Sequence, residues 1–203
     1  MPAIGYDQYS DYQLWQAFRK GSQPAFDLIF ERHVRLLYHY GRKFTPDTTL
    51  VEDCVQDLFV ELWERRAALG DTDSIRFYLY KSLRRRIVRA LTVARRFDPG
   101  DEADDGGAFG VHLSPEHTLI AAQLDAEQQH VLSTALAQLP KRQQEAVLLK
   151  YFDNLSNQQI AQVMDISVDS VYKLVCGALG SLKKLTRKVS LALLLAAWLG
   201  LGG

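Results

Sequence analysis

Apolar residues recur at helical spacing along most of the chain, and residues 51–66 (VEDCVQDLFVELWERR) show the pattern most clearly. The apolar face of this predicted helix consists of Val51, Val55, Leu58, Phe59 and Leu62. The opposite side carries Glu52, Asp53, Gln56, Asp57 and Glu64. A solvated acidic face explains these polar residues as well as a binding surface does, so the helix alone does not indicate a function.

A second predicted helix, residues 77–96, is basic and begins with aromatic residues. Between Lys81 and Arg96 there are seven basic residues and no acidic one, and Phe77, Tyr78 and Tyr80 lie at its start. Such a helix suits a nucleic-acid strand, because cations contact phosphates and rings stack on exposed bases. A basic helix that contacts only solvent is the alternative.

Two short helices with a tight connection are predicted within residues 155–178. Ser156 and Gln159 form a capping-box pattern that begins the first helix, and Ser167 is a candidate N-cap for the second. We expect Asp165 to adopt a left-handed backbone conformation in the turn between them. This spacing is typical of a helix-turn-helix.

The residues expected to fill the wedge between these two helices are Ile160, Met164, Ile166, Val171 and Leu174. The outward positions of the second helix are Asp169, Ser170, Tyr172, Lys173, Cys176 and Gly177. These side chains would reach base edges if the helix lies in a major groove. A small helical bundle without a DNA role is the alternative at this point.

The charge distribution divides the chain into parts. The net formal charge of the 203 residues is zero, but residues 98–116 (DPGDEADDGGAFGVHLSPE) contain six acidic residues and no Lys or Arg. With its glycines and prolines this segment is expected to be a linker with little intrinsic structure. The sequence therefore predicts an all-α fold with two small helical domains, 6–97 and 116–188, joined by a flexible acidic linker, 98–115. The C-terminal domain would contain the helix-turn-helix, and an apolar tail, 189–203, would follow it.

Several classes of function lack support in the sequence. Cys54 and Cys176 are too few for a disulfide framework or a zinc cluster, and no phosphate-binding loop or catalytic constellation is evident. We therefore expect no enzymatic activity, no cofactor, no metal and no small-molecule substrate. The N-terminus lacks a signal-peptide core, and the tail is too short to span a bilayer, which predicts a cytoplasmic protein. Packing against the second domain or a partner, and anchoring at a membrane surface, both remain open for the tail.

Taken together, these segments resemble the small, extracytoplasmic-function type of bacterial RNA polymerase sigma factor. The opening region contains Gly21, Ala25 and Phe26 of a family signature. The 51–66 segment is similar to a family block at Glu52, Asp53, Gln56, Asp57, Phe59 and Trp63, with Val51 replacing the usual Ala. The C-terminal region matches at Leu139–Pro140 and Ile160–Ala161, and Val171–Tyr172 with the apolar tail resembles the Bacteroidetes branch.

The resemblance implies partners and assigns roles to residues. Core RNA polymerase would bind through its β′ clamp and β flap, with the clamp contacting Asp53, Gln56, Asp57, Phe59 and Trp63. The −10 promoter element would be melted and read by Phe77, Tyr78, Lys81, Arg84, Arg85, Arg86 and Arg89. The −35 element would be read by Ser167, Asp169, Ser170, Tyr172, Lys173 and Cys176. Whether a membrane-bound anti-sigma factor holds the protein inactive is left open.

The chain departs from the family pattern at the DNA-reading helices. Arg85 stands where the family usually has Asn, and Gly177 and Gly180 stand where basic residues are common. We therefore expect weak or tolerant −35 binding, and tighter binding when a cation is introduced at Gly177. Two other functions remain as alternatives: a free-standing helix-turn-helix regulator that acts as a dimer, which leaves the 51–66 helix unexplained, and a scaffold protein, which leaves the basic helix unexplained.

Overall fold

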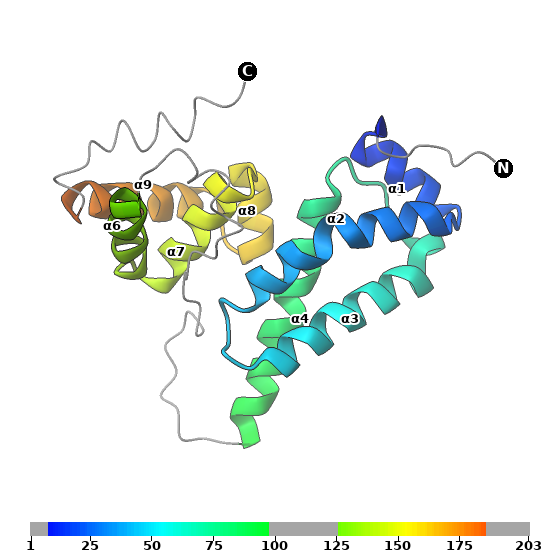
Figure 1. The fold of residues 1–203 in the computed structure, drawn as a ribbon, viewed down its shortest axis with the longest axis horizontal. Helices are drawn as coiled ribbons and strands as arrows, with labels where there is room; N and C mark the ends of the chain where they lie inside the picture. Colours follow the sequence, from blue (N-terminus) through cyan, green and yellow to red (C-terminus); the bar gives the residue numbers. More distant parts are fainter. Residues whose placement is uncertain (1–7, 98–125, 186–203) are drawn as a thin grey trace. The chain divides into compact units, whose positions relative to one another are not determined.

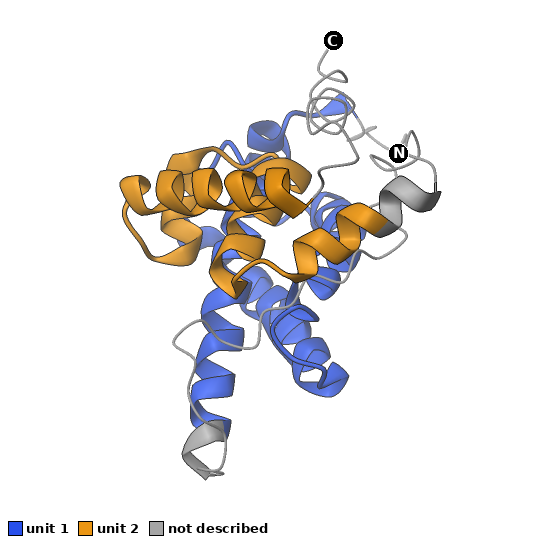
Figure 2. Ribbon diagram, turned by 90° about the vertical axis from the view of Figure 1, so that its left-hand side faces the viewer, with its two compact units in different colours: residues 1–102 blue, residues 103–203 orange. Residues whose placement is uncertain are grey.

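The computed structural model describes residues 8–97 and 126–185, which fall in two compact units, residues 1–102 and 103–203 (Figure 2). All regular elements in the described residues are helical, which confirms the predicted all-α fold (Figure 1). The predicted linker, 98–115, and the apolar tail, 189–203, lie outside the described residues. Within those residues, no helix combines the length and apolarity that crossing a bilayer requires.

The first unit contains four α-helices and a short 3₁₀ turn among its described residues. They are α1 (Asp11–Arg19), α2 (Gln23–Gly41), α3 (Thr48–Arg65), the 3₁₀ turn η2 (Arg66–Ala68) and α4 (Ile75–Phe97). The 51–66 prediction placed the start of α3 three residues too late. The helix begins earlier because the side chain of Asp47 accepts a hydrogen bond from the Leu50 N–H at 3.1 Å and caps it.

The core of the first unit forms where α1, α2, α3 and α4 pack together. Trp15, Phe18, Tyr40 and Tyr80 are almost completely buried there. Gly41, at the end of α2, permits a close approach to α3, because a Cβ atom at this position would lie 2.6 Å from Cγ1 of Val51. The apolar face predicted for α3 is confirmed as the buried one.

The second unit is built around the predicted helix-turn-helix. Its described elements are α6 (Ala126–Ala137), α7 (Lys141–Val147), a π-helical turn η4 (Leu148–Phe152), α8 (Asn157–Met164) and α9 (Val168–Leu185). The Ser156–Gln159 capping box is present, and Asp165 has φ 56° and ψ 51°, the left-handed conformation expected for the turn. The N–H of Ile166 then closes the end of α8 on the carbonyl of Ala161 at 3.0 Å.

The predicted wedge of the helix-turn-helix is correct at three of its five positions. Ile160, Met164 and Val171 are buried, whereas Ile166 and Leu174 are only half-buried. For Leu174, the reason is that α9 packs against α7 as well as α8. This second contact turns a different stripe of α9 inward, which consists of Val171, Val175, Ala178 and Leu182.

His33 is a buried titratable group in the core of the first unit. Its side chain on α2 is 7% exposed, and Nδ1 has no hydrogen-bond partner among the described residues. Burial lowers the pKa of His33 from 6.5 to about 4. The cations of Arg76 and Arg32 lower it further, and the carboxylate of Asp11 opposes them.

We predict that His33 makes the first unit sensitive to acid. Between pH 6.5 and about 4 the unfolded state binds a proton that the folded state does not, so stability falls as the pH falls through this window. The loss should reach about 3 kcal/mol at roughly 1.4 kcal/mol per unit. Chemical denaturation of His33→Phe at a series of pH values should show a shallower pH dependence than the natural chain. His39→Gln, in the same helix, is the control, and an equal slope for His33→Phe and the natural chain would contradict the prediction.

Candidate functional surfaces

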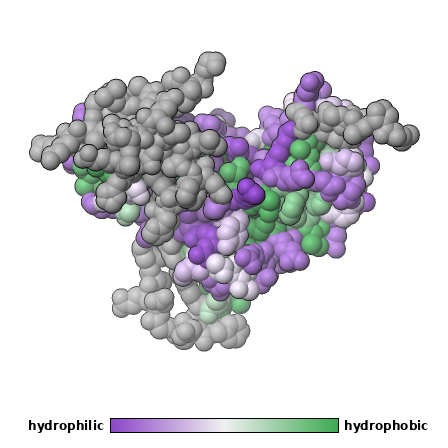
Figure 3. Space-filling view, in the orientation of Figure 1, coloured by the Kyte–Doolittle hydropathy of each residue, from purple (hydrophilic) through white to green (hydrophobic). Residues whose placement is uncertain are grey.

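An apolar groove of about 770 Å³ lies between α2 and α3 of the first unit. Its apolar lining consists of Phe26, Phe30, Val34, Tyr38, Val55, Phe59, Val60 and Trp63. Figure 3 shows green hydrophobic atoms gathered on this unit and bordered by purple hydrophilic ones. Phe30 is 41% exposed and Val60 is 51% exposed, so the groove presents apolar surface to solvent. Exposed apolar surface bordered by polar residues is typical of a protein-binding site.

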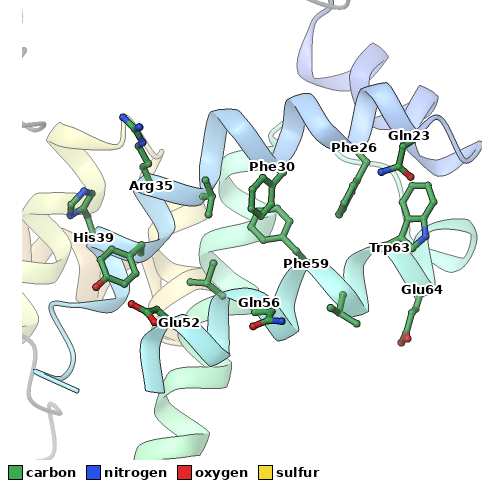
Figure 4. Close-up of a pocket in the computed structure, with 14 residues that line it drawn as sticks. Gln23, Phe26, Phe30, Arg35, His39, Glu52, Gln56, Phe59, Trp63 and Glu64 are labelled. Carbon is green, nitrogen blue, oxygen red and sulfur yellow. The ribbon is translucent and has the colours of Figure 1, made fainter. Parts of the chain in front are cut away.

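The aromatic rings of the groove hold one another in place. Phe59 contacts Phe30 with ring centroids 4.8 Å apart, and Phe26 contacts Trp63 at 5.1 Å (Figure 4). The guanidinium of Arg66 lies 4.3 Å from the centre of the Trp63 ring on α3. Because Phe59 is only 4% exposed, it forms the floor of the groove. The more exposed side chains on α2 and α3 are the ones that a partner would contact.

The structure divides the residues that the resemblance assigned to the polymerase. Gln56, Phe59 and Trp63 line the groove, whereas Asp53 and Asp57 are exposed on α3 outside it. The contribution of α2 was missed at the sequence level. The signal was present, because Ala25, Ile29, His33 and Leu37 recur every four residues as the buried stripe of α2 and leave Phe26 and Phe30 without a place in the core.

A second concave surface, a cleft of about 840 Å³, lies between α3 and α4. Its lining consists of Cys54, Asp57, Leu58, Glu61, Leu62, Arg65, Leu69, Tyr78, Ser82, Arg85, Arg86, Arg89, Ala90, Val93 and Ala94. Four of the residues assigned to the −10 element line it, namely Tyr78, Arg85, Arg86 and Arg89. The other three, Phe77, Lys81 and Arg84, are half-buried elsewhere on α4, where Lys81 Nζ lies 5.6 Å from the ring centre of Phe77. The cleft thus combines cations, an aromatic ring and an apolar floor.

The arginines of the cleft differ in their surroundings. Arg86 forms ion pairs with the carboxylates of Glu61 and Asp57 on α3, the latter at 3.9 Å, and its side chain is 27% exposed. Arg85 and Arg89 are exposed. Treating Arg86 as equivalent to its neighbours overlooked these carboxylates, which lie on a different helix. Its charge already has a role in joining α3 to α4.

Cys54 belongs to the floor of the same cleft. The side chain is 8% exposed, and burial raises the pKa of its thiol. The carboxylates of Asp57 and Asp53 act in the same direction, whereas the cation of Arg86 opposes them. The thiol therefore remains protonated at neutral pH and contributes apolar surface to the cleft.

The second unit presents the outward side of α9. Asp169, Lys173 and Cys176 are exposed, and Tyr172 is 55% exposed. Ser167 caps the helix, since its Oγ accepts a hydrogen bond from the Ser170 N–H at 3.1 Å, and the two hydroxyl oxygens lie 2.8 Å apart. Ser167 and Ser170 are therefore engaged with the start of the helix, while the other four assigned side chains project into solvent.

Two family models match the two units in the order in which the chain contains them. The model for sigma-70 region 2 matches residues 29–97, which include α3 and α4, and the model for sigma-70 region 4 matches residues 129–182, which include α8 and most of α9. The chain belongs to the sigma-70 family. It is a sigma factor of the extracytoplasmic-function type, which directs the initiation of transcription.

Curated relatives and solved structures agree with this assignment. The sigma factor is 24% identical over 173 residues to the ECF RNA polymerase sigma-E factor of Escherichia coli (strain K12), covering 81% of this chain and 88% of that protein. It is also 24% identical over 172 residues to the RNA polymerase sigma-H factor of Pseudomonas aeruginosa, with 81% and 87% covered.

Two solved structures share the fold. CnrH in complex with the cytosolic domain of CnrY matches with a TM-score of 0.56 and 25% identity, covering 89% of this chain and 99% of CnrH. The sigma factor RpoE in complex with the anti-sigma factor NepR from Bartonella quintana matches with a TM-score of 0.58 and 19% identity, covering 81% and 98%.

The two glycines of α9 differ in the space around them. Both lie on the side of the helix that carries Lys173, four and seven residues further along. A Cβ atom at Gly177 would lie 3.1 Å from Nε2 of Gln143 on α7, whereas nothing lies within 4 Å of one at Gly180. The close approach of α7 to α9 therefore explains Gly177, and nothing in the structure explains Gly180.

We predict that Gly180→Ala raises the free energy of unfolding of this sigma factor by about 0.8–1 kcal/mol, the difference in helix propensity between the two residues. Gly177→Ala is the matched variant and should gain less, because Gln143 has to move. Thermal or urea denaturation of both variants measures the difference. Because nothing lies near a Cβ atom at position 180, an added cation on α9 is better placed there than at position 177. Equal gains at both positions would show that the contact with Gln143 has no energetic consequence.

Proposed function

We propose that this sigma factor binds core RNA polymerase through the α2–α3 groove and the −10 promoter strand through the α3–α4 cleft. The observation that supports both assignments is that α3 contributes to the two surfaces with different side chains. Val60 and Trp63 line the groove, whereas Asp57 and Glu61 line the cleft. A partner seated in the groove therefore leaves the cleft side of α3 open to DNA.

The groove has the properties of a site for a helix of the polymerase. A helical partner places apolar side chains at intervals of three and four residues into such a groove, and buried aromatic residues provide much of the binding energy. We assign this role to the helices of the β′ clamp, as the family resemblance implies. Exposed acidic groups on α3, among them Glu52, Asp53 and Glu64, would accelerate association with a basic partner and make it depend on salt.

The cleft has the properties of a site for a single DNA strand. Arg85 and Arg89 are exposed and available for phosphates, and the half-buried ring of Tyr78 offers a surface on which a base can stack. Reading a base in this way requires that it leave the duplex stack, which costs a few kcal/mol. We therefore assign Arg85, Arg89 and Tyr78 as the principal −10 contacts, with Arg86 holding the cleft together.

For the second unit, we propose that α9 reads the −35 element and that the unit binds the β flap. The exposed Tyr172, Lys173 and Cys176 and the capped N-terminus of α9 support the DNA role. Within the sigma-70 family, we also propose a place in the Bacteroidetes branch, supported by Val171–Tyr172 and by the apolar tail, which lies outside the described residues. Because a transcription initiation factor acts in the cytoplasm and catalyses no reaction, we propose both properties for this chain as well.

An anti-sigma factor is a further partner that we propose for this chain. The support is the likeness to RpoE of Bartonella quintana, which was solved in complex with the anti-sigma factor NepR. Co-purification of the full chain with the product of an adjacent anti-sigma-like gene would test this partner.

The groove assignment predicts that Val60→Asp reduces the affinity for core polymerase at least tenfold. A carboxylate placed in an apolar interface without a partner costs about 1.4 kcal/mol or more, which corresponds to this factor. Val88→Asp is the matched control, because Val88 is 40% exposed in the same unit but lines neither the groove nor the cleft. Fluorescence titration of core polymerase with each variant provides the measurement. Equal affinities of the two variants would rule out the groove as the polymerase site.

The cleft assignment predicts that removing one exposed arginine reduces the salt dependence of promoter binding. Arg85→Ala and Arg89→Ala should each lower the slope of log affinity against log salt by about one unit in the holoenzyme. Lys20→Ala is the control, because Lys20 is exposed in the same unit and lines neither surface. Arg86→Ala should instead lower the free energy of unfolding, since it leaves Glu61 without its partner on α4. Unchanged slopes for both Arg85→Ala and Arg89→Ala would refute the DNA role of the cleft.

A further inference from the structure

We propose that α1 is a positioning element for promoter opening, which holds the connection between α3 and α4 in the conformation that shapes the cleft. The connection comprises η2 and residues 69–74 and is called the α3–α4 loop below. This inference rests on the proposed −10 role of the cleft. Its subject is a set of residues on α1 that lies outside both the groove and the cleft: Asp11, Trp15, Gln16 and Arg19.

These four residues contact successive parts of the α3–α4 loop and the start of α4. The indole N–H of Trp15 donates to the carbonyl of Gly70 at 2.9 Å. Gln16 Nε2 donates to the carboxylate of Asp71 at 2.7 Å, and the guanidinium of Arg19 forms an ion pair with the same carboxylate. Asp11 Oδ2 accepts a hydrogen bond from the N–H of Ile75, the first residue of α4, at 2.9 Å.

The spacing of the contacts shows that one side of α1 faces the loop along its length. Asp11, Trp15 and Arg19 are each four residues apart, so their side chains project from the same side of the helix. Trp15 and Arg19 contact residues 70 and 71, near the start of the segment, whereas Asp11 contacts Ile75 at its end. The contacts therefore fix both ends of the segment from 70 to 75.

The loop has few contacts of its own that would fix this conformation. Within the loop, two hydrogen bonds join Thr72 to Ser74, and a weaker bond of 3.4 Å joins the N–H of Leu69 to the carbonyl of Arg66. All three bonds are local. The side chain of Arg66 and the hydroxyl of Ser74 join the loop only to the adjoining ends of α3 and α4, at Trp63 and Phe77. The contacts from α1 supply the long-range restraint, because they join residues 52 to 64 positions apart in the sequence.

Trp15 connects this restraint directly to the cleft. Its side chain is completely buried, and its ring contacts the ring of Tyr78 with centroids 5.1 Å apart. Tyr78 and the loop residue Leu69 both line the cleft. One side chain of α1 therefore sets the position of a ring in the cleft and of the loop that borders it.

The consequence for function follows from the cost of ordering a binding site. A cleft that is already ordered does not lose conformational entropy when a base enters it, so more of the interaction energy is available to hold the base outside the duplex. If the contacts from α1 are lost, the loop has to be ordered at the moment of binding. The affinity for the unstacked strand should then fall, while the groove, on the other side of α3, keeps its affinity for polymerase.

The experiment compares two acidic residues of the same loop in the full chain. Asp71→Ala removes the acceptor for Gln16 and Arg19, whereas Asp73→Ala is the matched control, because Asp73 is exposed and makes none of the α1 contacts described above. Holoenzyme is assembled with each variant and titrated with a fluorescent single-stranded oligonucleotide carrying the −10 sequence of a promoter that it transcribes. Binding to core polymerase is measured in parallel.

We expect Asp71→Ala to weaken strand binding about fivefold or more, and Asp73→Ala to leave it unchanged, with core binding equal in both. Arg19→Ala should give the same loss of strand binding. The double variant Arg19→Asp with Asp71→Arg forms the ion pair with its charges exchanged and should recover part of the strand binding. Such a recovery is not expected if the two residues form only a structural surface contact. Trp15→Phe, which keeps a ring beside Tyr78 but removes the N–H, should weaken binding as well.

Strand binding by Asp71→Ala equal to that of Asp73→Ala would overturn the inference. If Arg85→Ala and Arg89→Ala still weaken strand binding in that case, only the role of α1 fails and the cleft remains the −10 site. If all of these variants bind the strand like the natural chain, the proposed −10 role of the cleft fails together with the inference.

Discussion

The arrangement of the first unit depends on how α3 is buried. Its apolar stripe packs between α2 and α4, and this packing is close enough at Gly41 that a single methyl group would meet Val51. A helix held in this way can present only its two flanks. One flank, with Val60 and Trp63, forms the groove together with α2, and the other, with Asp57 and Glu61, forms the cleft together with α4. Burial of one stripe thus creates two separate binding surfaces on one rigid element.

Electrostatics distinguishes the residues of the cleft that maintain it from those that are free to bind. The ion pairs of Arg86 with Glu61 and Asp57 join α4 to α3 at partly exposed positions, where such pairs contribute about 1 kcal/mol or less each. Their value lies in geometry, because they orient α4 so that Arg85 and Arg89 face solvent at the cleft. In the proposed role of α1, the contact of Asp11 with the start of α4 and that of Arg19 with the α3–α4 loop serve the same purpose at the end of the cleft.

The second unit shows how packing limits the chemistry of a recognition helix. Contacts of α9 with both α7 and α8 turn Val171, Val175 and Ala178 inward and leave Tyr172, Lys173 and Cys176 outside. Lys173 is the one cation among the outward residues assigned to the −35 element. Gly177 permits Gln143 of α7 to lie against α9, so its small size has a structural cause. Gly180 has no such neighbour, so it lowers helix stability while no contact in the structure requires a glycine there.

The sequence by itself determined the all-α fold, the helix-turn-helix and the family. Local signals are sufficient for these features: the Ser156–Gln159 capping box, the left-handed Asp165 and the apolar stripe of α3 each act within a few residues. Only the tertiary structure decided which side chains share a surface. The groove needs Phe26 and Phe30 from α2, the pairing of Arg86 needs Glu61 from another helix, and the loop contacts of Trp15 join positions 55 residues apart. Periodicity identifies the buried side of a helix, but the partner of each exposed side chain is set by how the helices pack, which local spacing does not encode.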